Sequence, residues 1–165
     1  MNRGKAMSSS ARETQSPVNL ATLYSGSSRH AIDGSNRIML PSDWRDEGTP
    51  MSFFVLVSGP NEFLKVCPPP VFDEFLADLK NDTADKSSIP EYERELSDGV
   101  RRVSLDRFGR LPLPADFLTR VGIKGQGELV GRFSKFEIWA PDKYEAVQAR
   151  RQQVPSPLKN KIQQL

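Results

Sequence analysis

The sequence Leu-Asp-Arg-Phe-Gly-Arg-Leu-Pro-Leu-Pro at residues 105–114 carries the pattern around which the rest of the chain is arranged. It predicts a strand, a tight turn that ends at Gly109, a second strand, and a helix that begins at Pro114. Seventy-three positions earlier, residues 32–41 read Ile-Asp-Gly-Ser-Asn-Arg-Ile-Met-Leu-Pro. Both stretches fit the frame apolar–Asp–x–x–x–Arg–apolar–x–Leu–Pro, so each places an arginine at the mouth of a predicted hairpin.

The similarity between the two halves extends well beyond these hairpins. In a gapless alignment, eleven of the 45 positions from Tyr24 to Pro68 are identical to the residue 73 places on, against about three expected from average composition. The identical pairs are Gly26/Gly99, Arg29/Arg102, Asp33/Asp106, Arg37/Arg110, Leu40/Leu113, Pro41/Pro114, Asp43/Asp116, Leu56/Leu129, Val57/Val130, Phe63/Phe136 and Pro68/Pro141. The pattern indicates a duplicated unit. Each copy is too small to bury much apolar surface alone, so we expect the two to share one core.

The two turns are built from residues suited to a hairpin. A hairpin that closes on a type I turn needs a positive φ just before its second strand, which glycine adopts most easily. Gly109 stands there in the second hairpin, and Asn36, which also tolerates the left-handed region, stands there in the first. Asp33 and Asp106 begin the turns, where a short carboxylate accepts backbone N–H groups. The arginine of each frame is therefore expected at an equivalent position.

Arg37 and Arg110 allow two interpretations. Each guanidinium either pairs with the aspartate of its own hairpin or reaches outward to a phosphate or a guanine edge, since its planar fork forms bidentate bonds with all of these. The spacing alone favours neither. Further arginines make the hairpin ends locally basic and favour nucleic acid: Arg29, Arg101, Arg102 and Arg107.

The remaining pattern predicts five segments. They are a disordered arm at 1–20, a first repeat at 21–80, a linker with a short helix at 81–100, a second repeat at 101–151, and a flexible tail at 152–165. Strands are expected at 53–57, 62–66, 128–133 and 136–139, and helices at 71–79, 90–98, 114–121 and 141–151.

Composition excludes several classes of protein. The formal net charge is +2, but residues 21–140 carry −3, so a uniformly basic DNA-coating protein is excluded and any nucleic-acid contact must be local. The longest apolar run, 53–57, is far too short to span a bilayer. No secretory signal is recognised, and with a single cysteine the chain fits a cytoplasmic setting.

No catalytic or cofactor site emerges from the sequence. His30 is the only histidine and Cys67 the only cysteine, which disfavours a metal cluster or a Ser/His/Asp triad. Residues 122–127 are rich in glycine but lack the spacing of a phosphate-binding loop. We therefore expect no cofactor, no small-molecule substrate and no enzymatic activity.

The paired hairpins, together with the run Gly-Arg-Phe-Ser-Lys-Phe-Glu-Ile-Trp at 131–139, resemble the MraZ family. The resemblance covers about residues 24–147. The first hairpin departs from the family, which usually has a basic residue and then glycine where this chain has Ser35 and Asn36.

The resemblance implies a fold and a function. The fold would be α+β, an AbrB/MraZ-like double-split β-barrel built from two internal repeats with flanking helices. The function would be that of a bacterial transcription factor, nucleoid-associated, which binds repeated double-stranded DNA boxes upstream of the division and cell-wall gene cluster as a homo-oligomeric ring. By the resemblance, Arg37 and Arg110 occupy the positions of the family's DNA contacts. We further expect these two to lie nearer the bases, with phosphate contacts from Arg29, Arg102 and Arg107. The alternative is an AbrB-like protein–protein module, an antitoxin or a structural ring, without DNA readout.

Overall fold

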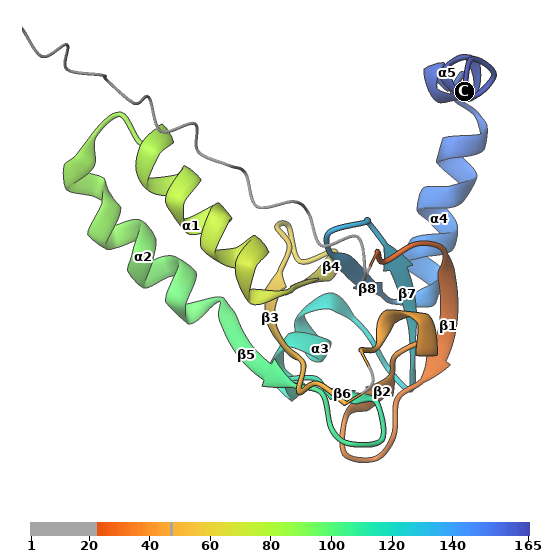
Figure 1. Cartoon of the computed structure of the whole chain (residues 1–165), viewed down its shortest axis with the longest axis horizontal. Helices are drawn as coiled ribbons and strands as arrows, with labels where there is room; N and C mark the ends of the chain where they lie inside the picture. Colours follow the sequence, from red (N-terminus) through yellow and green to blue (C-terminus); the bar gives the residue numbers. More distant parts are fainter. Residues whose placement is uncertain (1–22, 47) are drawn as a thin grey trace, which may run out of the picture.

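The computed structural model describes residues 23–46 and 48–165, so the predicted arm at 1–20 lies outside the described residues. The fold is α+β, with a six-stranded antiparallel sheet at its centre (Figure 1). The strand order is β1 (Ser27–Ala31), β7 (Gln126–Gly131), β8 (Phe136–Trp139), β4 (Phe63–Cys67), β3 (Ser52–Val57) and β5 (Val100–Ser104). Strands from both halves of the chain are therefore interleaved in a single sheet.

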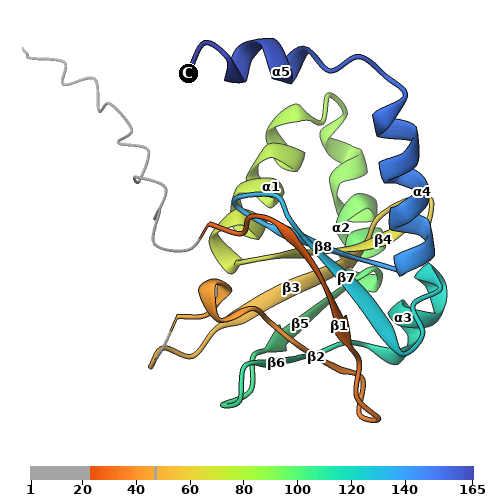
Figure 2. The same ribbon diagram turned by 90° about the vertical axis from the view of Figure 1, so that its right-hand side faces the viewer.

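A second, two-stranded sheet joins the two hairpins. It consists of β2 (Arg37–Met39) and β6 (Arg110–Pro112), which run antiparallel with Ile38 opposite Leu111. Both of these apolar side chains are fully buried. The pairing brings together segments that lie 73 residues apart and places both loops at the same end of the molecule (Figure 2).

The helices lie on the periphery. The α-helices are α1 (Pro69–Asp82), α2 (Ile89–Asp98), α3 (Ala115–Val121), α4 (Pro141–Gln152) and α5 (Pro157–Ile162), and short 3₁₀ helices are η1 (Ser42–Trp44) and η2 (Lys86–Ser88). Proline occupies the first turn of α1, α2, α4 and α5, where its missing N–H leaves no hydrogen bond unmade. Gly122, at φ 71°, ends α3 in the left-handed conformation.

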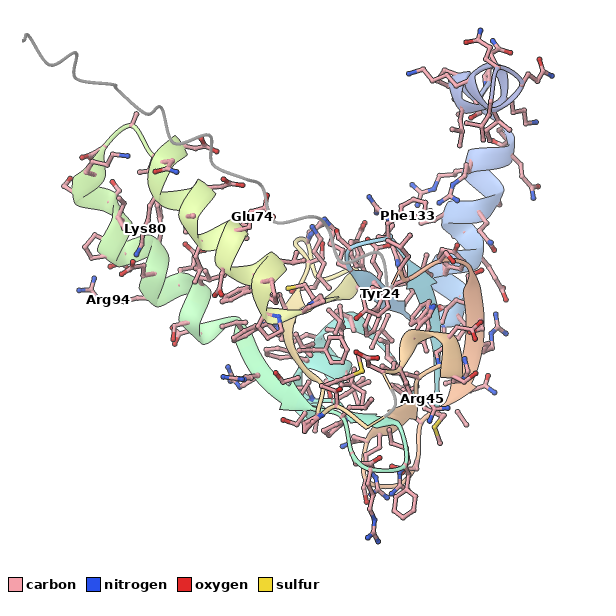
Figure 3. The ribbon with its side chains drawn as sticks, in the orientation of Figure 1. Tyr24, Arg45, Glu74, Lys80, Arg94 and Phe133 are labelled. Carbon is pink, nitrogen blue, oxygen red and sulfur yellow. The ribbon has the colours of Figure 1, made fainter. Side chains whose placement is uncertain are left out.

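One apolar core is shared by both halves of the chain. Its aromatic centre is Tyr24, which packs against Trp44, Phe53 and Phe136 with ring centroids 5.1–6.3 Å apart. All four side chains are at most 3% exposed, and Figure 3 shows Tyr24 in the middle of the molecule. This agrees with the expectation that neither half buries enough apolar surface by itself.

Helices α1 and α2 form an antiparallel pair at one side of the sheet (Figure 1). Phe72 at the start of α1 stacks on Phe54 of β3, with ring centroids 4.2 Å apart, and this contact attaches the pair to the sheet. Further along the pair, Lys80 Nζ lies 3.4 Å from Glu93 Oε1. No helix of the described residues has the length and apolar character needed to cross a membrane.

The structure differs from the sequence prediction mainly at element ends. The strand expected at 128–133 runs instead from Gln126 to Gly131, because Phe133 has φ 64° and belongs to the turn that follows. The helix expected at 90–98 within the linker corresponds to α2, and the short helix η2 precedes it. The tail at 152–165 includes α5, all of whose residues are exposed.

Candidate nucleic-acid interface

The two hairpins use the same set of turn hydrogen bonds. Asp33 Oδ1 accepts the backbone N–H groups of Ser35 and Arg37, each at 2.9 Å. Asp106 Oδ1 accepts those of Phe108 and Arg110, again at 2.9 Å. Each aspartate therefore holds its turn closed, which is the role that short carboxylates play at this position.

The residue before each return strand has a positive φ, as the turn type requires. Gly109 has φ 83° and Asn36 has φ 58°. Each also donates its N–H to the carbonyl oxygen of its own aspartate, at 3.0 Å. The sequence prediction for these two positions is thus matched by the backbone.

The four charged residues of the frame form one cluster, which we call the Asp–Arg quartet: Asp33, Arg37, Asp106 and Arg110. Arg37 Nε donates to Asp33 Oδ2 at 2.9 Å, and Arg110 Nε donates to Asp106 Oδ2 at 2.8 Å. Each arginine also approaches the aspartate of the other hairpin, with Nη1 to Oδ2 distances of 3.9 Å in both cases. The quartet has no net charge.

These contacts lower the pKa of both carboxyls. For Asp33 the largest cause is the hydrogen bond from the backbone of Arg37, which outweighs partial desolvation. For Asp106 desolvation acts first and raises the pKa, but the hydrogen bonds from the backbone and side chain of Arg110 bring it below its ordinary value. Both aspartates are therefore ionised at neutral pH, and the quartet is a closed set of ion pairs.

The arginines of the quartet retain an outward-facing part. The side chain of Arg37 is 33% exposed and that of Arg110 is 27% exposed. The Nε atom of each arginine donates to the aspartate of its own hairpin, but no hydrogen bond from either Nη2 is found among the described residues. The same side chain can thus pair with its aspartate and present the end of its fork to a ligand.

Arg107 and Phe108 extend the second hairpin into solvent. The Phe108 ring is 54% exposed, with the guanidinium carbons of Arg107 and Arg110 at 4.7 Å and 5.0 Å from its centroid. These are cation–π contacts, which hold the cations against an exposed aromatic face. Arg107 therefore lies beside the quartet, where the sequence predicted it.

Arg29 and Arg102 are not brought together with the quartet. They lie on β1 and β5, which form the opposite ends of the six-strand order. Arg29 Nε is 3.1 Å from Glu128 and its Nη2 is 2.8 Å from Glu145, so its charge is offset by two carboxylates. Arg102 is exposed and contacts Ser52 Oγ at 3.4 Å.

Arg45 is a basic residue at this end of the molecule that sequence reasoning missed (Figure 3). Its side chain lies so close to Gly109 that a Cβ atom at Gly109 would overlap it. A further basic residue, Lys124, lines a depression of about 310 Å³ beside Asp33 and Asn36. No local sequence signal identifies either position, because both approach the hairpins only through the tertiary fold.

The described residues contain no group of three or more histidine, cysteine, aspartate or glutamate side chains arranged to hold a metal ion. Burial raises the pKa of the Cys67 thiol to about 11. The thiol is therefore protonated at neutral pH, and protonated thiols are poor nucleophiles. The hairpin end, formed by the two turns with β2 and β6, holds the Asp–Arg quartet, and Arg107 and Arg45 lie beside it.

Comparison with known proteins identifies relatives of this chain. The model of the family described as "MraZ protein, putative antitoxin-like" matches residues 98–163. The chain is 29% identical over 124 residues to the transcriptional regulator MraZ of Lachnoclostridium phytofermentans, covering 75% of this chain and 86% of that protein. It is 23% identical over 140 residues to the MraZ of Ureaplasma urealyticum, covering 85% and 97%. The MraZ of Chlorobium phaeobacteroides is 28% identical over 129 residues, covering 73% and 84%.

Proposed function

We propose that this chain, which belongs to the MraZ family of transcriptional regulators, binds double-stranded DNA in a sequence-specific manner through the hairpin end of the molecule. The observation that carries the proposal is the Asp–Arg quartet with exposed arginines beside it. Two turns, held by the same hydrogen bonds, present two guanidinium groups side by side. A rigid pair of forks at fixed spacing is suited to reading base edges, whereas flexible basic tails are suited only to binding the polyanion.

The neutrality of the quartet assigns different roles to different arginines. Since the charges of Arg37 and Arg110 are offset by two aspartates, the net attraction to DNA must come from basic residues around them. Arg107 and Arg45 are adjacent to the second hairpin, and we assign them to phosphates. Arg102 is exposed and remains a candidate for a more distant phosphate, and Arg29 contributes least because Glu128 and Glu145 pair with it.

The chain is also proposed to be an internal duplication folded as a double-split β-barrel. Strands β1 and β5, and likewise β2 and β6, begin 73 residues apart. The strand order β1-β7-β8-β4-β3-β5 reads the same from both ends when each strand is exchanged for its counterpart in the other half. An approximate two-fold axis through the quartet accounts for both observations, and it places the two arginines in symmetric positions.

In the cell, we propose a nucleoid-associated regulator that acts without catalysis or cofactor. Its DNA targets would be repeated boxes upstream of the division and cell-wall gene cluster, as the family resemblance implies. A chain whose hairpin end has only a few uncompensated cations would bind one box weakly. Assembly into a homo-oligomeric ring would bring several hairpin ends to successive boxes and raise the overall affinity through effective concentration.

Fluorescence anisotropy with the DNA upstream of the chain's own gene tests this proposal. Arg107→Ala and Arg110→Ala should each weaken binding, and the Arg107 variant should also reduce the salt slope, log K against log salt, by about 0.9 for the lost phosphate contact. Arg94→Ala is the matched control, because Arg94 is an exposed arginine on α2 that pairs with Glu91. Unchanged affinity in the combined Arg107 and Arg110 variant would remove the proposed DNA site.

A second candidate function is a protein–protein module without DNA readout. The observation in its favour is that both Nε atoms of the quartet arginines are satisfied within the chain, next to the exposed Phe108 ring. Aromatic residues and arginine are both enriched in protein interfaces. Salt distinguishes the two functions, since DNA affinity falls steeply with rising salt, while a mainly apolar contact does not.

A further inference from the structure

The C-terminal helix α5 carries an apolar stripe that nothing in the described structure covers. Leu158 and Ile162 are one helical turn apart and are 59% and 58% exposed. Val154 and Leu165 lie just before and just after α5 and are 66% and 109% exposed. Residues three or four apart lie on one face of a helix, so Leu158 and Ile162 form an apolar stripe on α5 that faces solvent. Such faces on short helices typically pack into a groove of a partner.

A groove of matching character lies between α1 and α2. Its volume is about 250 Å³, and Phe72, Leu76, Leu96 and Val100 contribute its apolar lining. Two large side chains on the same helix pair, Phe75 and Tyr92, are 45% and 43% exposed. Two antiparallel helices with an open apolar seam can accept a third helix, which completes a three-helix arrangement.

The two surfaces carry opposite charge. From residue 69 to 98, the α1–α2 pair has nine acidic and three basic side chains, all exposed, with a net charge of −6. From residue 150 to 165, the C-terminal segment has four basic side chains and no acidic ones: Arg150, Arg151, Lys159 and Lys161. Lys159 and Lys161 flank the apolar stripe, so docking would place these cations beside the acidic rims of the groove.

The two surfaces lie on different parts of one chain. In Figure 1 the α1–α2 pair and the α4–α5 segment lie on opposite sides of the sheet. A surface on one side that is complementary to a different surface on the other side makes a head-to-tail contact. Repetition of such a contact closes into a ring or continues as a filament.

We infer that α5 of one copy docks in the α1–α2 groove of a neighbouring copy. The apolar stripe supplies the buried contact, and the acidic groove rim together with the basic helix sets its orientation. This inference rests on the self-association in the proposed function and specifies the surfaces that make it. The contact lies far from the quartet, so each copy keeps its hairpin end free for DNA.

Site-specific cross-linking between two variants tests the contact directly. Purified Phe75→Cys protein is mixed with purified Leu158→Cys protein, oxidised, and separated on a non-reducing gel. A mixed disulfide-linked dimer can form only between two different chains, and the buried Cys67 does not compete. Asn160→Cys is the matched control, since Asn160 lies on the same exposed helix, turned about 200° away from Leu158. We expect at least a tenfold excess of the Phe75–Leu158 product.

Equal yields of the two products, or no product, would overturn the inference. Docking of α5 on its own chain is the other outcome that would overturn it, and it would appear as an intrachain link in the double variant with no product in the mixture. The stripe residues are exposed, so Leu158→Ser with Ile162→Ser should leave the fold intact while light scattering shows a smaller assembly. Asn160→Ser should leave the assembly unchanged.

The same variants separate this inference from the DNA proposal. The variant with both stripe residues replaced should bind a single DNA box as tightly as the wild type does. It should lose only the additional affinity that the wild type has for DNA with repeated boxes. Cross-linking without any DNA affinity would refute the DNA site and support the interface. DNA affinity without cross-linking would refute the interface and support the DNA site.

Discussion

Arg110 Nη1 lies 3.9 Å from Asp33 Oδ2, so the arginine of the second hairpin faces the carboxylate of the first. The reciprocal distance, from Arg37 Nη1 to Asp106 Oδ2, is also 3.9 Å. The two hairpins are therefore linked electrostatically as well as through the pairing of β2 with β6. A substitution at either aspartate should therefore change the electrostatic environment of both arginines.

Replacing both aspartates with asparagine separates stability from DNA affinity. In the Asp33→Asn, Asp106→Asn variant the amide oxygens can still accept the turn hydrogen bonds, but the two negative charges are gone. We expect a lower melting temperature and a steeper salt dependence of DNA binding, because Arg37 and Arg110 then act as uncompensated cations. Calorimetry and anisotropy measure the two effects. An unchanged salt slope would show that these arginines do not contact DNA.

The lowered pKa values of Asp33 and Asp106 predict acid sensitivity. Carboxyls whose pKa is depressed in the folded state contribute stability that is present above their unfolded pKa, about 3.9. This contribution is lost as pH falls through the folded value. Protonation of these two carboxyls should therefore cause part of the fall in melting temperature that is measured below about pH 4. The double asparagine variant should lose that part of the decline, and identical pH profiles for the two proteins would contradict the assignment.

Gly131 should tolerate no side chain. A Cβ atom there would overlap the backbone carbonyl of Tyr24, which cannot move without breaking the bridge between Tyr24 and Phe133. We expect Gly131→Ala to lower the free energy of unfolding by about 1–3 kcal/mol, as overpacking does. Gly34→Ala is the control, since nothing lies within 4 Å of its Cβ position. Urea denaturation of both variants measures the difference, and equal stabilities would show that the backbone adjusts.

The phenol of Tyr24 should lose its proton at a higher pH than that of an ordinary tyrosine. Its burial, with a smaller effect from Asp46, raises the pKa of the phenol to about 12. A group whose pKa is raised by folding contributes stability that is complete below its unfolded pKa of about 10. The contribution disappears as pH rises toward 12. Absorbance at alkaline pH should show one tyrosine ionising together with unfolding, and Tyr24→Phe should remove that phase. If this phase persists in the Tyr24→Phe variant, a group other than Tyr24 is responsible for it.

Much of the fold followed from local patterns. The turn residues Asp33, Asn36, Asp106 and Gly109 predicted two hairpins, and the structure has both tight turns, with positive φ at Asn36 and Gly109. The strands on either side of each turn pair elsewhere, since β1 pairs with β7, β5 pairs with β3, and β2 pairs with β6. The strand at 136–139 and the helix at 141–151 were predicted within one residue of their observed ends. These features are set by side-chain-to-backbone hydrogen bonds and by apolar periodicity, both of which act over a few residues.

The turns, the duplicated pattern and the family resemblance could therefore be read from the amino-acid sequence alone. The folded chain was needed to show that β2 pairs with β6, that the four charges of the hairpins meet in one neutral quartet, and that Arg45 lies against Gly109. It also separated Arg29 and Arg102, which are equivalent in sequence, to opposite ends of the sheet order. These contacts join residues about 70 positions apart, so they depend on how the shared core packs. Local propensity does not determine that packing.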